Sequence, residues 1–254
     1  KKMWASDADG YAYIVAFLKA WRAFLTENGW YGLLTQHVTD EPQTYSREDY
    51  YKIACAVRQQ LPGVPLIDAT DIHDLPGALD VWVFKPYYYT AHKEAFEMMR
   101  ATGNEMWYYT ACFPLGKYLN RFLDKRLCEP RLLHWANYVY DIRGYLHWGL
   151  NMIQQRQEPF GAKHMPEQTI AARLPPGDTH IVYPGEGRPW GSMRGENMMY
   201  GAQDFELFAL LEKKDARRAM EIARSVVRAF DDFEGDTEKI EAARIAALEA
   251  LEKE

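Results

Sequence analysis

Two adjacent carboxylates, Asp40 and Glu41, occupy the position in this sequence that is best suited to catalysis. They close an apolar stretch that we interpret as the end of a strand over residues 30–38, and Pro42 stops the strand directly after them. In α/β barrels the functional groups lie at the C-terminal ends of the strands. The pair is therefore predicted to face a pocket, although Asp-Glu-Pro is also ordinary turn composition.

The adjacency of the two acids favours one kind of chemistry. Successive side chains on a regular strand point to opposite faces, so the pair cannot easily flank a glycosidic bond about 5 Å apart, as in most retaining glycosidases. Where the chain leaves the strand, both can reach a pocket from one side. This layout suits substrate-assisted hydrolysis of a 2-acetamido sugar, in which the acetamide oxygen attacks the anomeric carbon. One carboxylate would hold the acetamide, while the other would protonate the leaving oxygen and then deprotonate water.

Aromatic and polar side chains at or near the predicted strands are candidates for binding a sugar. An aromatic ring offers an apolar face on which the C–H face of a sugar can pack, although the same rings could simply fill the core. The candidates are His37, Tyr88, Trp107, Tyr109, Trp148 and Asn151. Of these, His37 is expected to support the acid pair rather than to react itself.

Composition restricts the class of partner. The chain has 254 residues, of which 48% are hydrophobic and 14% aromatic, and its net charge is −6. The sequence shows no basic block, so nucleic acid is not a predicted partner. It also lacks an apolar run of the roughly 20 residues that a membrane span requires. The three cysteines have no metal-type spacing, and neither a metal nor a cofactor is predicted.

Hydrophobic periodicity and turn residues predict alternating helices and strands. Strands are predicted at 30–38, 64–68, 81–84, 105–110 and 145–148, helices at 11–28, 46–63, 92–102, 131–142 and from 197 onward, and a polar loop from 154 to 189. Alternation of this kind indicates βαβ units and a parallel sheet.

The predicted fold class is α/β, of the (β/α)8 barrel type. A closed barrel needs eight strands, and the loop and terminal helices leave no room for three more. We therefore predict an incomplete barrel, comprising about strands 4–8, in residues 1–212 and a helical extension in 213–254; a complete smaller α/β sheet is the alternative. The chain opens on Lys1-Lys2 without a methionine, so a longer parent is expected, with the chain alone a weak catalyst. The sequence specifies neither the compartment nor the oligomeric state. A secreted or periplasmic bacterial parent is one option.

Further motifs follow the acid pair in a fixed order. They are Trp107–Cys112, Asn120–Asp124, Gly144–Asn151, Gly177–Gly185, Ser192–Arg194 and Gly201–Glu206. Together with Asp40-Glu41-Pro42, this series resembles the catalytic barrel of glycoside hydrolase family 123 and its relatives, over about residues 11–212. The resemblance implies a carbohydrate substrate and a retaining exo-β-N-acetylgalactosaminidase that works by substrate assistance. It also implies that Asp40 holds the acetamide and that Glu41 is the acid/base.

Two other readings of the sequence stay open. The first is a non-catalytic carbohydrate-binding or structural domain that kept the barrel without turnover. The second is a conventional glycosidase acting on sugars without the acetamide. It would need a second carboxylate about 5 Å or 6.5–9.5 Å from Glu41, which Asp68 or Asp71 could supply.

Overall fold

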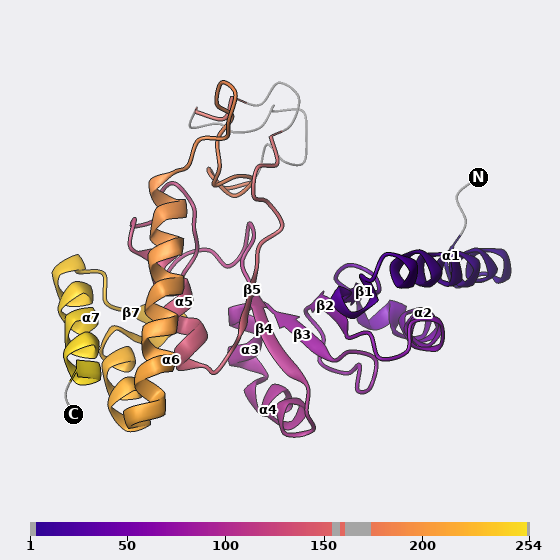
Figure 1. Cartoon of the computed structure of the whole chain (residues 1–254), viewed down its shortest axis with the longest axis horizontal. Helices are drawn as coiled ribbons and strands as arrows, with labels where there is room; N and C mark the ends of the chain where they lie inside the picture. The colour runs from indigo at the N-terminus through magenta and orange to yellow at the C-terminus, as the bar shows by residue number, and fades with distance from the viewer. Residues whose placement is uncertain (1–3, 154–157, 161–173, 253–254) are drawn as a thin grey trace. The chain divides into compact units, whose positions relative to one another are not determined.

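The computed structural model describes residues 4–153, 158–160 and 174–252, which fall into two compact units (Figure 1). Unit 1 extends to Tyr108, and unit 2 begins at Tyr109. The boundary therefore lies at the end of strand β4 (Glu105–Tyr109).

Unit 1 contains the first strands of the sheet and the helices between them. In chain order its elements are α1 (Ala8–Glu27), η1 (Tyr31–Leu33), β1 (Gln36–His37), η2 (Thr44–Ser46), α2 (Arg47–Gln60), β2 (Leu66–Thr70), β3 (Val81–Phe84), α3 (Pro86–Ala91), α4 (Lys93–Ala101) and β4 (Glu105–Tyr109). Most of these elements match a predicted helix or strand to within a few residues. The short helix α3, which begins at a proline, was not predicted.

The sheet has five strands in the order β1-β2-β3-β4-β5, and β1–β2, β2–β3 and β3–β4 pair in parallel. All four residues of β3 are buried, as expected of a parallel strand covered on both faces. The α/β class and the parallel sheet are thus confirmed. The described residues contain five strands in this sheet, and a closed eight-stranded barrel is not formed within them.

The first strand is much shorter than predicted. The prediction of a strand over 30–38 is wrong except for the two residues of β1, because the chain before β1 turns through η1 and leaves Leu33 82% exposed. Beyond β1, the backbone N–H groups of Val38 and Thr39 donate to the side chain of Asp68. Pairing with β2 ends there because a side chain has taken the place of the backbone acceptor.

Unit 2 consists of one strand of the sheet, a helical layer and a small hairpin. Its elements are α5 (Glu129–Val139), β5 (Gly144–Leu146), α6 (Met193–Val226), β6 (Val227–Ala229), β7 (Asp232–Phe233) and α7 (Thr237–Glu252). The hairpin β6–β7 was not predicted. The loop predicted over 154–189 lies partly outside the described residues. Among the described helices, none is both long and apolar enough to cross a membrane.

One buried carboxylate links all three C-terminal helices. Asp204 on α6 accepts hydrogen bonds from Nε of Arg131 on α5 at 2.5 Å and from Nε of Arg244 on α7 at 2.9 Å. It also accepts from the indole N–H of Trp135 at 2.8 Å. Helix α6 packs on both α5 and α7 (Figure 1). The predicted division at residue 212 falls within α6 and stays a prediction.

Candidate active site

The parallel pairing of β1, β2 and β3 places the C-terminal ends of these strands at one edge of the sheet. Glu41 lies in the turn after β1, Asp71 follows β2 directly, and Lys85 follows β3 directly. These are the positions at which an α/β barrel carries its functional groups. The segments that follow three different strands therefore bring two carboxylates and one lysine ammonium to the same edge of the sheet.

A buried carboxylate fixes the backbone that leads to the acid pair. One oxygen of Asp68, Oδ2, accepts from the N–H groups of Val38 and Thr39, each at 3.2 Å, and from the Tyr50 hydroxyl at 2.6 Å. The other oxygen, Oδ1, lies 2.7 Å from Nε2 of His37. This hydrogen bond to Asp68 raises the pKa of His37, and burial beside the same carboxylate raises the pKa of Tyr50. His37 is thus paired with Asp68, which is itself inaccessible to solvent.

The turn that carries the acid pair is conformationally strained. Glu41 has φ of +43°, in the left-handed region that is rare for residues other than glycine. The side-chain amide of Gln43 donates to the Glu41 carbonyl oxygen at 3.0 Å and so holds the turn. Asp40 is exposed, and Pro42 is buried. Strained non-glycine residues cluster at functional sites, so the backbone conformation of Glu41 supports it as a candidate functional residue.

Lys85 connects two carboxylates. Its ammonium nitrogen lies 2.6 Å from Oδ2 of Asp71 and 3.1 Å from Oε1 of Glu41. Because both oxygens contact one nitrogen, they cannot lie more than about 6 Å apart, close to the carboxyl separation of about 5–5.5 Å in retaining glycosidases. Burial opposes the charge on Lys85, but Asp71 and Glu41 outweigh it, and the pKa of Lys85 is raised. We call Glu41, Asp71 and Lys85 the acid–lysine cluster.

Two predicted sugar-binding aromatics belong to unit 1. The hydroxyl of Tyr88 on α3 hydrogen-bonds Nδ1 of His73 at 2.9 Å. Burial, and then the negative charges of Asp71 and Asp74, raise the pKa of Tyr88. Trp107 on β4 is half-buried, and its indole N–H donates to Glu105 of the same strand at 2.7 Å.

The remaining predicted residues belong to unit 2. Tyr109 is buried, and the backbone of Asn151 forms a short antiparallel bridge with that of His180 while the Asn151 residue is exposed. Trp148, two residues beyond β5, is 40% exposed, and its indole N–H donates to Oδ2 of Asp178 at 3.0 Å. Of these three residues, Trp148 combines an exposed ring with a fixed anchor, as a sugar platform requires.

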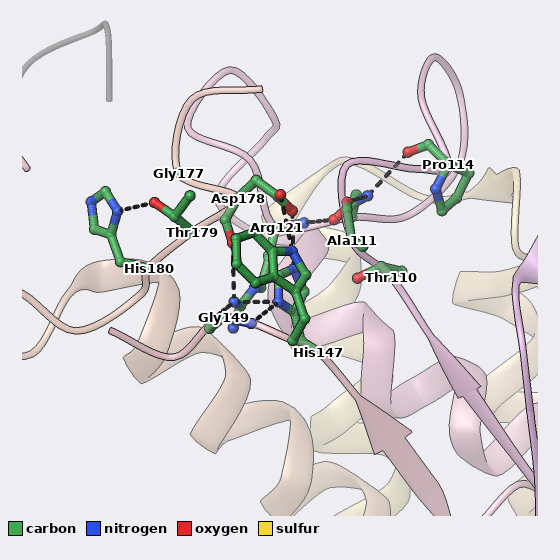
Figure 2. Close-up of polar contacts among 12 residues, drawn as sticks. Thr110, Ala111, Pro114, Arg121, His147, Gly149, Gly177, Asp178, Thr179 and His180 are labelled. Atoms are coloured by element: carbon green, nitrogen blue, oxygen red, sulfur yellow. Dashed lines mark hydrogen bonds and ion pairs between the residues drawn. The ribbon is translucent and has the colours of Figure 1, made fainter. Parts of the chain in front are cut away.

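The polar network behind Trp148 was not predicted. Figure 2 shows Arg121, His147 and Asp178 hydrogen-bonded among the segments that follow β4 and β5 and the segment around Gly177. Each lies inside a motif named above, but nothing in the sequence indicated that these motifs meet. Lys85 was also missed, although its place directly after a strand was a usable signal.

A metal site does not emerge from the described residues. Within 4–153, 158–160 and 174–252, no three or more His, Cys, Asp and Glu side chains are grouped so that they could hold a metal ion.

Comparison with known proteins places this chain in a family. The family model described as the glycoside hydrolase 123 catalytic domain matches residues 2–211. A solved structure of a family 123 glycoside hydrolase from Clostridium perfringens, described for glycolipid glycan hydrolysis, superposes with a TM-score of 0.68 at 15% identity. That match covers 92% of this chain and 43% of the clostridial chain, so this chain spans less than half the length of that protein. Among curated proteins, no match to the sequence was found. Because the family model covers most of the sequence, the chain belongs to glycoside hydrolase family 123.

Proposed function

We propose that this domain hydrolyses β-linked 2-acetamido sugars, of the N-acetylgalactosamine type, with retention at the anomeric carbon and with assistance from the substrate. Family membership supports a glycosidase acting on a carbohydrate. The finer proposal rests on the strained turn that carries Asp40 and Glu41 at the C-terminal edge of the sheet.

Each member of the pair has a separate task. Asp40 accepts a hydrogen bond from the acetamide N–H, which orients the acetamide oxygen and stabilises the positive charge as that oxygen attacks C1. Glu41 gives its proton to the departing glycosidic oxygen. The resulting oxazolinium ion is opened by water, which Glu41 deprotonates, and the retained sugar is released.

Lys85 imposes a condition on this cycle. Its ammonium lies 3.1 Å from Glu41 and so stabilises the carboxylate, the form needed to deprotonate water. The acid step requires the protonated form instead. Substrate binding must therefore separate Lys85 from Glu41, leaving the ammonium with Asp71, its nearer partner at 2.6 Å.

A second function is favoured by the same cluster. Glu41 and Asp71, held on one ammonium, are close enough to act as the acid/base and nucleophile of a conventional retaining glycosidase, which would not need an acetamide. Asp68 is a poor candidate for this role because its oxygens are occupied by the end of β1, Tyr50 and His37.

The acid/base role is tested with Glu41→Gln and two aryl 2-acetamido-β-galactosides. The variant should lose about 10²–10⁴-fold in kcat/KM on a substrate with a poor leaving group and clearly less on one with a good leaving group, which needs little protonation. Glu48→Gln is the matched control, since Glu48 is an exposed acid in the first turn of α2. Equal losses on both substrates, with glycosylation rate-limiting, would show that Glu41 is not the acid.

Substrate assistance is tested with Asp40→Asn, with Asp49→Asn as the exposed control in the same unit. Asp40→Asn should slow turnover severely, and a thiazoline mimic of the cyclised intermediate should inhibit the native chain. Efficient hydrolysis of the matching 2-hydroxy glycoside, abolished by Asp71→Asn, would instead establish the conventional pair. Sugar binding without turnover would support the non-catalytic reading.

A further inference from the structure

We propose that Arg121, His147 and Asp178 are positioning residues that hold Trp148 as a rigid platform for a pyranose ring. This inference rests on the proposed action on a sugar and extends it to residues that no comparison assigns. All of the residues concerned lie in unit 2.

The anchor of Trp148 is unusually strong for an exposed side chain. The residue is 40% exposed, yet its indole N–H donates at 3.0 Å to Asp178, which is inaccessible to solvent. A hydrogen bond to a charged group contributes about 1.5–3 kcal/mol, more than most surface contacts. The ring is therefore fixed at its N–H edge, and part of its surface stays open to a ligand.

The second oxygen of Asp178 is oriented by a histidine whose tautomer can be assigned. Nδ1 of His147 faces two groups that only donate, the guanidinium of Arg121 at 2.6 Å and the N–H of Gly149 at 3.1 Å. Nδ1 must therefore accept, so the ring proton of neutral His147 is on Nε2. That nitrogen lies 3.3 Å from Oδ1 of Asp178. A continuous series of polar contacts thus runs from Arg121 through His147 to Asp178.

Arg121 joins the backbone of the two segments that meet here. Its Nη2 also donates to the carbonyl oxygen of Gly149 and, over 3.4 Å, to that of Asp178 (Figure 2). Burial lowers the pKa of Arg121 to about 10, so the guanidinium stays charged at neutral pH. Burial, reinforced by the charge of Arg121, lowers the pKa of His147 to about 4 despite the opposing hydrogen bond to Asp178, so His147 stays neutral. The tautomer needed by the network is thus the one present under ordinary conditions.

An aspartate is required at position 178 for a specific reason. Oδ2 accepts from the indole N–H of Trp148 at 3.0 Å, and Oδ1 lies 3.3 Å from Nε2 of His147, which carries the ring proton. An asparagine has nearly the same shape but only one acceptor, so either orientation of its amide directs an NH₂ group at a donor. Asp178→Asn should therefore release Trp148 without removing volume from the site.

Release of Trp148 can be observed directly through its indole N–H signal in an NMR spectrum of the chain carrying ¹⁵N-labelled tryptophan. The signal is assigned by its absence in Trp148→Phe. Asp178→Asn should shift or broaden it. Asp204→Asn is the matched control, because Asp204 is equally buried and also accepts an indole N–H, that of Trp135. The control should move the Trp135 signal and leave the Trp148 signal in place.

Binding of the methyl β-glycoside of N-acetylgalactosamine then connects the network to function. Trp148→Ala should raise the dissociation constant about tenfold, which is the loss of affinity expected when an aromatic platform is removed. Asp178→Asn should raise the dissociation constant at least threefold, while Asp204→Asn should leave it unchanged. One combination of results would overturn the positioning role alone. In it, Trp148→Ala binds the sugar more weakly, but Asp178→Asn keeps both the native Trp148 signal and the native affinity.

A second variant keeps the test decisive if Asp178→Asn does not fold. His147→Asn retains an acceptor that can face Arg121 and Gly149, but its side chain is shorter than imidazole and places no N–H where Nε2 of His147 approaches Asp178. It should also shift the Trp148 signal and weaken sugar binding. Native affinity in Trp148→Ala, by contrast, would refute the sugar platform itself and so the part of the proposed function that Trp148 carries. A Trp148 signal unmoved in His147→Asn would refute the network whatever the sugar result.

Discussion

Replacing Lys85 by methionine should expose a repulsion that the native protein suppresses. Methionine preserves most of the apolar stem and removes only the ammonium. Glu41 and Asp71 would then face each other with their oxygens at most about 6 Å apart, since both now contact Lys85. Two carboxylates at that distance repel by about 3 kcal/mol at an effective dielectric of 20, and by less than about 1 kcal/mol in water. Because Glu41 is partly exposed, we expect about 1–3 kcal/mol.

The assay is urea unfolding at low salt, compared at pH 7 and pH 4. Lys85→Met should lower the free energy of unfolding by about 1–3 kcal/mol at pH 7 and by clearly less at pH 4, where one carboxyl takes up a proton. The double variant Lys85→Met with Glu41→Gln should recover most of the loss at pH 7, because the repelling charge is gone.

A matched control is available in the same unit. Nη1 of Arg47 lies 2.6 Å from Oδ2 of Asp74, the same distance as Lys85 from Asp71, but that pair is far more exposed to solvent. Arg47→Met should therefore cost less than about 1 kcal/mol. The reasoning would be refuted by an equal loss for Lys85→Met at both pH values, or by no recovery in the double variant.

Three further outcomes are expected. Glu41→Gly should raise the free energy of unfolding by about 1 kcal/mol, because it removes a left-handed non-glycine residue; Asp141→Gly, at φ of +50°, is the control outside the acid pair. Tyr50→Phe should lower that free energy by about 1.5–3 kcal/mol, as Asp68 loses a buried donor at 2.6 Å. The pKa of His147 is depressed to about 4 from 6.5, so the unfolded chain binds its proton first and stability is lost as pH falls from about 6.5 to 4. The stability deficit of His147→Gln, measured by urea unfolding, should therefore shrink by up to about 3 kcal/mol over that range.

Local signals in the sequence were sufficient for most of the secondary structure. The strand predicted over 81–84 matches β3, and the helix predicted over 92–102 corresponds to α4, which ends at Ala101, two residues before Gly103 with its φ of +94°. Apolar runs and glycine caps act over a few residues, so a single sequence carries them. A neighbouring proline likewise led to the prediction that Asp40 and Glu41 directly end a strand, but β1 ends at His37, three residues before Asp40.

Features set by distant residues were not predictable. β1 ends where it does because Asp68, about thirty residues away in sequence, takes the N–H groups of Val38 and Thr39. The ion pairs of Lys85 depend on the register of three strands, which residue patterns do not specify. The prediction over 30–38 failed on this point, because an apolar stretch was taken as a strand without knowing which acceptors its backbone would meet.

The motif around Gly177 shows why a pattern can be recognised before its physical basis is known. Gly177 has φ of +82°, and a Cβ there would lie 2.5 Å from Nη1 of Arg194 and 2.9 Å from Cγ of Leu123. The space is needed because Arg194 passes against this backbone to donate to the carbonyl oxygens of Gly177 at 2.9 Å and of Arg121 at 2.6 Å. The arginine of one motif thus ties the backbone beside Asp178 to the residue that orients His147. In the sequence these motifs are separate segments in a fixed order, and only the fold reveals that they form one polar network behind Trp148.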